Sequence, residues 1–235
     1  MCFSTEMSVA TGVVLLPAGA YCVSAALRKN RHYLLVAATP AFFGIQQLCE
    51  AGVWIGFDNR DARLVRESTI AYLFFAIAFW PGWVPFGAAI LERRPGKRAL
   101  CFILSGIGLA MGCLCYFPAV FHYGEWLNVY IMGHSIRYDF SGLPFVHSIL
   151  SIVWQVLYLG IVSVPLLISR DHALRALGIT IALAALAAQL MFRYAFISVW
   201  CFFAAVVSLH IAYIVYRLPD PHPHPVAPEM QFQPV

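Results

Sequence analysis

The chain has 235 residues, of which 61% are hydrophobic and 11% are charged. Its mean hydropathy of +0.77 excludes an ordinary soluble globular protein and predicts a multi-pass membrane protein, whose partner is the lipid bilayer. The net charge of +4 comes from Lys and Arg in short loops beside apolar segments, and no basic face interleaved with aromatic residues is built for nucleic acid.

Seven apolar runs are long enough to cross a hydrocarbon core, which takes about 20 residues in helix. The last two form one apolar stretch, and we place a tight turn at Arg193 because a single helix of that length would exceed about 60 Å. The sequence predicts an all-α domain of seven transmembrane helices over residues 1–217 and a Pro-rich disordered tail over residues 218–235. The runs cover residues 7–27, 33–56, 68–91, 99–121, 144–168, 174–192 and 194–216.

Charged loops predict the orientation of these helices. The start of the chain lacks the basic region of a signal peptide, so the first run is expected to remain as a span. Ten of the 15 Lys and Arg residues fall on one side of the predicted membrane. By the positive-inside rule that side is cytoplasmic, which places the N-terminus outside and the C-terminus in the cytoplasm. The five on the other side are Arg60, Arg63, Arg66, Arg137 and Arg193.

The second run holds the most informative residue, Glu50, together with Gln46 and Gln47. A charged side chain near the bilayer centre costs at least about 2.5–3.5 kcal/mol on insertion scales, so it is by default a candidate functional site. Gln46 and Glu50 share a helix face at i and i+4. At 1.5 Å per residue, Glu50 is expected roughly 9 Å below the outer boundary.

The third run contains Pro81 and Pro85 near mid-membrane. Two prolines there free backbone groups that neighbours or water must satisfy. A simple kink and a ligand-lining break are both compatible with this pattern. The fourth loop, from His122 to Gly142, is long for a helix connection and is rich in aromatic residues, a composition suited to an interfacial cap.

Two further runs carry polar stripes. His147, Gln155 and Tyr158 recur at helical spacing in the fifth run, and Ser198 and Cys201 follow in the seventh. Both stripes begin at the depth expected for Glu50. Because lipid-facing polar groups are unfavourable, we expect the three polar faces to turn inward and meet. The structural alternative is that the serine bonds to a backbone carbonyl and the histidine lies at the interface.

Several cofactors can be tested against the residue types. The only lysines, Lys29 and Lys97, lie in loops, so a retinal Schiff base is excluded. The sequence has no zinc motif, and its seven cysteines indicate no disulfide framework. Haem between His147 and either His122 or His134 is geometrically possible. The sequence therefore does not identify a cofactor.

Five short motifs occur along the chain: Met1–Ser4 (MCFS), Leu15–Gly19 (LLPAG), Phe43–Leu48 (FGIQQL), His134–Tyr138 (HSIRY) and Ser198–Ala205 (SVWCFFAA). Together they resemble a family of uncharacterised bacterial multi-pass membrane proteins, over about residues 1–218. The resemblance implies a bacterial inner (plasma) membrane and no particular chemistry. It directs attention to eight residues: Cys2, Gln46, Gln47, Glu50, His134, Tyr138, Trp200 and Cys201.

Three functions remain open. The leading hypothesis is an outer-leaflet polar pocket that binds or transports a small polar ligand, an ion or a lipid head group. The second is an intramembrane metal- or haem-dependent enzyme, with Cys2, Glu50, His134 and His147 as candidate metal ligands. The third is a non-catalytic sensory or partner-binding module. The candidate ligand-binding residues are Gln46, Gln47, Glu50, His134, Tyr138, His147, Gln155, Ser198, Trp200 and Cys201.

Overall fold

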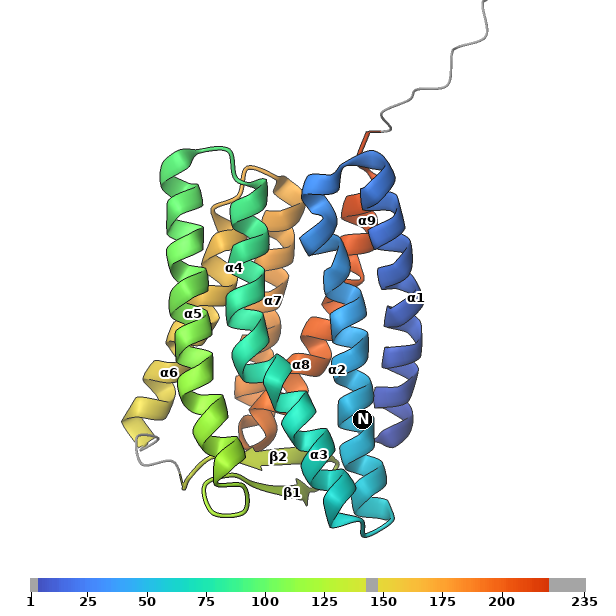
Figure 1. The fold of residues 1–235 in the computed structure, drawn as a ribbon, viewed down its shortest axis with the longest axis vertical. Helices are drawn as coiled ribbons and strands as arrows, with labels where there is room; N and C mark the ends of the chain where they lie inside the picture. Colours follow the sequence, from blue (N-terminus) through green and yellow to red (C-terminus); the bar gives the residue numbers. More distant parts are fainter. Residues whose placement is uncertain (1–3, 143–147, 220–235) are drawn as a thin grey trace, which may run out of the picture.

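The computed structural model describes residues 4–142 and 148–219, and apart from one β-hairpin they form helices (Figure 1). Six helical units in these residues have the length and hydropathy of a membrane span. Within α6 (Ser148–Leu167), the stretch Val153–Leu167 is a shorter apolar helix. The predicted all-α fold is confirmed, and six to seven helices, where the sequence predicts seven, are long and apolar enough to span a membrane. The six units are α1 (Thr5–Lys29), η1–α2 (Arg31–Tyr33 and Leu34–Asp58), α3–η2–α4 (Ala62–Leu73, Phe74–Phe79 and Trp80–Leu91), α5 (Pro95–Phe121), α7 (His172–Met191) and α8–α9 (Phe196–Ser208 and His210–Tyr216).

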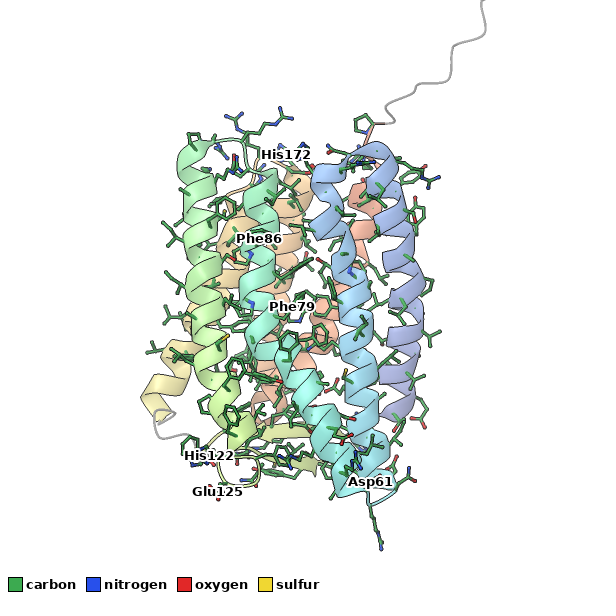
Figure 2. All side chains as sticks on the ribbon, viewed as in Figure 1. Asp61, Phe79, Phe86, His122, Glu125 and His172 are labelled. Carbon is green, nitrogen blue, oxygen red and sulfur yellow. The ribbon has the colours of Figure 1, made fainter. Side chains whose placement is uncertain are left out.

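The helices alternate in direction, so the bundle has two distinct ends (Figure 1). The hairpin end carries the start of α1, the α2–α3 turn, the β-hairpin and the short 3₁₀ turn η3 (Arg193–Ala195) between α7 and α8. The basic end carries the α1–α2, α4–α5 and α6–α7 connections and the end of α9. Figure 2 shows His122 and Glu125 at the hairpin end, His172 at the basic end, and Phe79 and Phe86 between them. Of the predicted tail, only residues 218 and 219 fall within the described residues.

The third span contains a π-helix, η2, which ends at Phe79, two residues before Pro81. The N–H of Trp80 donates to the carbonyl of Phe75, five residues back. Pro81 has no N–H to continue this ladder, and the Ala76 carbonyl instead accepts a hydrogen bond of 2.6 Å from the Tyr158 hydroxyl of α6. The span therefore passes through its proline region as a continuous helix, with a freed carbonyl satisfied by a neighbour.

Two glycines allow α5 to lie directly against this region. A Cβ atom added at Gly108 would lie 2.2 Å from the carbonyl oxygen of Pro81, and one at Gly112 would lie 2.4 Å from that of Ile77. Such separations are shorter than any real contact, so only glycine fits at either position. These two positions form a small-xxx-small pair, which lets helix backbones approach closely in a membrane.

The loop after α5 forms an antiparallel hairpin of β1 (Asn128–Met132) and β2 (Ser135–Asp139) across the hairpin end of the bundle (Figure 1). Its turn contains Gly133 at φ +59°, a left-handed conformation that glycine adopts without strain. Ile136 and Tyr138 of β2 are buried, whereas His134 in the turn is exposed. The hairpin therefore covers the helix ends with the inner face of β2.

Candidate functional site

Glu50 lies on α2 and is 2% exposed. The Ser198 hydroxyl of α8 donates a hydrogen bond of 2.5 Å to one of its carboxylate oxygens. The Gln47 side-chain amide donates a longer one, of 3.5 Å, to the other oxygen. Among the described side chains no cation contacts this carboxylate, and the side chain of Arg193 is outside that set. A buried acidic group is therefore held by neutral partners.

The helical period of α2 explains why three polar side chains gather at one place. Gln46, Gln47 and Glu50 occupy successive inward positions, and both glutamines are 0% exposed. The Gln46 side-chain oxygen accepts a hydrogen bond of 2.7 Å from the indole N–H of Trp80, the first residue of α4. The Trp80 ring stacks on Phe43 of α2, with centroids 3.9 Å apart. The packing of α4 on α2 thus fixes the orientation of Gln46.

Two more side chains complete this group. Tyr72 of α3 is fully buried, and its hydroxyl donates a hydrogen bond of 3.4 Å to the backbone carbonyl of Ile197. The same hydroxyl lies close to Glu50 and to Cys201, and Cys201 lies close to Gln46. The Tyr72 ring stacks on Tyr138 of the hairpin, with centroids 5.0 Å apart and planes at 15°. We call Gln46, Gln47, Glu50, Tyr72, Ser198 and Cys201 the Glu50 cluster.

Four buried polar atoms in and beside the cluster have no hydrogen-bond partner within the described part of the chain. Gln46 Nε2 and Trp200 Nε1 are donors, Gln47 Oε1 is an acceptor, and the Tyr138 hydroxyl can act as either. Buried polar groups in folded proteins nearly always have partners, including bound water. These atoms therefore have hydrogen-bonding capacity that no described side chain or backbone group uses.

Two small cavities adjoin the cluster. One of about 150 Å³ lies between η2, α6 and α8 and is lined in part by Gln155. A second of about 60 Å³ extends toward the basic end, and the two share Tyr158, Trp200 and Cys201. Ligand pockets for drug-sized molecules are roughly 300–1,000 Å³, whereas one water needs only about 10–15 Å³. The cavities are suited to water or a very small solute, and Cys201 connects them to the Glu50 cluster.

The structure brings together some of the candidate residues from the sequence and separates others. Gln46, Gln47, Glu50, Ser198 and Cys201 form one cluster, with Tyr138 stacked on its edge. Gln155 and Trp200 line the neighbouring cavity. His134 is exposed on the hairpin turn, away from these groups. Cys2 and His147 lie outside the described residues.

Metal and haem hypotheses depend on histidines that the described structure does not bring to Glu50. Residues 4–142 and 148–219 contain no group of three or more His, Cys, Asp or Glu side chains placed to hold a metal ion. His122 lies near the surface of the hairpin end and stacks on Trp126, with centroids 3.8 Å apart. Its ring therefore does not face the bundle interior.

Sequence reasoning missed two partners of the cluster, Tyr72 and Trp80. Tyr72 follows Thr69 by three residues, and both are fully buried, so this pair was a weak signal for an inward polar face. Trp80 stands within the proline segment, where its partner could not be inferred because the π-helix alters the direction in which α4 faces.

Comparisons with known proteins give a family and no activity. No curated protein matches the chain, and no solved structure matches it. A family model does match, over residues 1–225, and its description is a family of unknown function, DUF6629. Because the match covers nearly the whole chain, the protein belongs to the DUF6629 family.

Proposed function

We propose that this protein is a multi-pass protein of the bacterial inner membrane whose Glu50 cluster binds a small polar solute or ion that enters from the hairpin end. The observation that carries the proposal is a buried carboxylate held by neutral partners, beside amide atoms that have no hydrogen-bond partner among the residues the structure describes. The positive-inside rule supports an outward-facing hairpin end and a cytoplasmic basic end.

The chemistry of the cluster favours a ligand that donates hydrogen bonds or carries positive charge. Glu50 and Gln47 Oε1 present acceptor oxygens, and Ser198 Oγ has lone pairs besides the hydrogen that it donates. A carboxylate in a low-dielectric interior is strongly unfavourable unless it is compensated by a proton, a cation or several donors. A small cation or a polar solute with N–H or O–H groups would provide this compensation.

The hairpin is the proposed cover of the site. Its residue Tyr138 stacks on Tyr72, which lies close to Glu50, so one aromatic pair joins the cover to the cluster. The Tyr138 hydroxyl, which has no hydrogen-bond partner in residues 4–142 and 148–219, lies on this entry side. A ligand arriving from the hairpin end would meet Tyr138 first and the Glu50 carboxylate afterwards.

Ligand-dependent stability tests the proposal. Purified protein in nanodiscs is heated at fixed pH with sodium, potassium, ammonium and a set of small polar solutes. A ligand at 100 times its Kd stabilises the folded state by about 2.7 kcal/mol. We expect at least one ligand to raise the Tm of the wild type and of Glu125→Gln, a control at an exposed carboxylate of the same end, but not of Glu50→Gln. Equal shifts in the wild type and in Glu50→Gln would overturn the proposal.

Transport is a second candidate, favoured by the position of the cavities. The cavity of about 60 Å³ extends from Cys201 toward the basic end, where Val36 and Ile211 line it. A solute bound at the Glu50 cluster would find its next polar contact at Trp200 on this route. Uptake of the stabilising ligand into proteoliposomes tests this version, because a protein that only binds shows a Tm shift without accumulation.

A further inference from the structure

A second hollow lies at the basic end, opposite the Glu50 cluster. Its volume is about 700 Å³, within the roughly 300–1,000 Å³ typical of ligand pockets. Residues from four segments line it: the α1–α2 connection, the α4–α5 loop, the α6–α7 loop and the chain just after α9. We call this the basic hollow. It combines ligand-sized space with the charged end of the protein.

Three arginines line the basic hollow: Arg93, Arg98 and Arg170. All three are exposed, and within the described residues no carboxylate pairs with any of them. The guanidinium of Arg98 lies over the Phe102 ring, 5.6 Å from its centroid, and this neutral partner attracts the cation without neutralising its charge. Each guanidinium presents several N–H donors in a planar fork that matches carboxylate and phosphate oxygens.

The two acidic residues of the hollow already have partners. Glu92 accepts hydrogen bonds of 3.1 and 3.0 Å from the Arg94 guanidinium, which hold the pKa of Glu92 at about 2. Asp171 accepts a hydrogen bond of 3.0 Å from the Tyr33 hydroxyl, and its other oxygen accepts one of 2.8 Å from the backbone N–H of Ala173. Arg94 therefore offsets the charge of Glu92. Asp171 keeps its charge but pairs with none of the three lining arginines, so together with Arg94 the hollow keeps a net positive charge.

We propose that the basic hollow binds a phosphate group. Its arginines supply the donors, and Leu91, Leu174 and Leu218 in the lining give the hollow an apolar part for a carbon chain attached to that phosphate. The phosphate comes either from the headgroup of an anionic lipid or from a soluble phosphorylated compound. This site is separate from the Glu50 cluster and does not depend on the function proposed for it.

Binding measurements with matched charge variants test the site. Purified protein in detergent is titrated with short-chain phosphatidylglycerol, short-chain phosphatidylcholine and inorganic phosphate. The variant Arg93→Gln/Arg98→Gln/Arg170→Gln removes three charges from the hollow. We expect it to bind phosphatidylglycerol or phosphate at least about tenfold more weakly than the wild type, which corresponds to about 1.4 kcal/mol. The control removes three charges from the same end outside the lining: Arg28→Gln/Arg31→Gln/Arg217→Gln, which we expect to bind as the wild type does.

The outcomes distinguish the two sources of the phosphate group, and they include results that overturn the proposal. Binding of phosphatidylglycerol without inorganic phosphate identifies a lipid headgroup, and binding of inorganic phosphate identifies a soluble source. The proposal is overturned if neither phosphatidylglycerol nor inorganic phosphate binds, or if phosphatidylcholine binds as tightly as phosphatidylglycerol. It is also overturned if both triple variants lose the same affinity, because general attraction to a charged surface then explains the result. If the triple variant in the basic hollow does not fold, the single variants Arg93→Gln and Arg170→Gln are each compared with Arg28→Gln. Equal affinities of these three variants for phosphatidylglycerol and phosphate overturn the proposal.

Discussion

Replacing Ser198 with alanine tests the hydrogen bond that holds the Glu50 carboxylate. The hydroxyl donates at 2.5 Å, and both side chains are 2% exposed, so water is not expected to replace the lost donor. A hydrogen bond in a membrane interior is worth about 0.6 kcal/mol on average and up to about 1.7, and leaving a buried acceptor unpaired costs about 1–3 kcal/mol. We expect Ser198→Ala to lower the free energy of unfolding by about 1–2 kcal/mol.

Ser163→Ala is the matched control. Ser163 of α6 is also buried, at 4% exposure, but its hydroxyl has no hydrogen-bond partner within the described residues. Removing it therefore leaves no other group unsatisfied, and the unfolding free energy is expected to stay the same or to rise slightly. Both variants are unfolded reversibly in mixed micelles with increasing denaturing detergent, and equal stabilities for the two would refute the reasoning.

A double-mutant cycle with Glu50→Gln then tests whether the loss of stability in Ser198→Ala comes from the contact between Ser198 and Glu50. If Ser198 acts through Glu50, its substitution costs less when Glu50 has already been changed, and the interaction energy is about 0.5–3 kcal/mol. Strict additivity would mean that Ser198 stabilises the bundle by some other contact.

Two further predictions follow from the packing and from the basic end. Gly108→Ala places a Cβ 2.2 Å from the Pro81 carbonyl, so we expect it to lower the unfolding free energy by about 1–3 kcal/mol, whereas Gly106→Ala, which meets nothing within 4 Å, is expected to cause no loss. A thermal unfolding series on both variants checks this, and equal losses would contradict the close approach of the helices. Arg94 hydrogen bonds lower the pKa of Glu92 from its usual 4.5 to about 2, so Glu92 stabilises the fold above pH 4.5 and this contribution is lost as the pH falls toward 2. The Tm of Glu92→Gln should lie below that of the wild type at pH 7 and approach it between pH 4.5 and 2, and a constant difference over that range would contradict the assignment.

Much of the fold follows from hydropathy because each span must be about as long as the bilayer is thick. The seven apolar runs correspond to the helical units, and the turn expected at Arg193 is present as η3. The hairpin could not be derived this way, since its strands lie outside the apolar runs and are short. Its best sequence signal is the alternation around Ile136 and Tyr138, next to Gly133 in a turn.

The candidate site was partly predictable for the same reason. The polar faces of the second and seventh runs meet at Glu50 and Ser198, as expected when polar groups avoid lipid. His134 could not be placed, because a loop residue carries no periodic pattern to show which way it points. Tyr72 had only the weak signal of its spacing from Thr69, and Trp80 could not be placed because the irregular helix before it changes the direction in which α4 faces.

The π-helix η2 has a consequence for the number of residues in the third span. In an unbroken α-helix, Tyr72 and Trp80, which are eight residues apart, would point in directions about 80° apart. A π-turn absorbs one extra residue, so their spacing becomes equivalent to seven residues, or about two turns, and both can contact α2. The span of 30 residues, Ala62–Leu91, is thus one residue out of phase with a regular helix. Deleting one residue between 74 and 79 would restore the phase and keep both faces aligned, whereas a deletion between Trp80 and Leu91 would rotate the rest of α4 by about 100°.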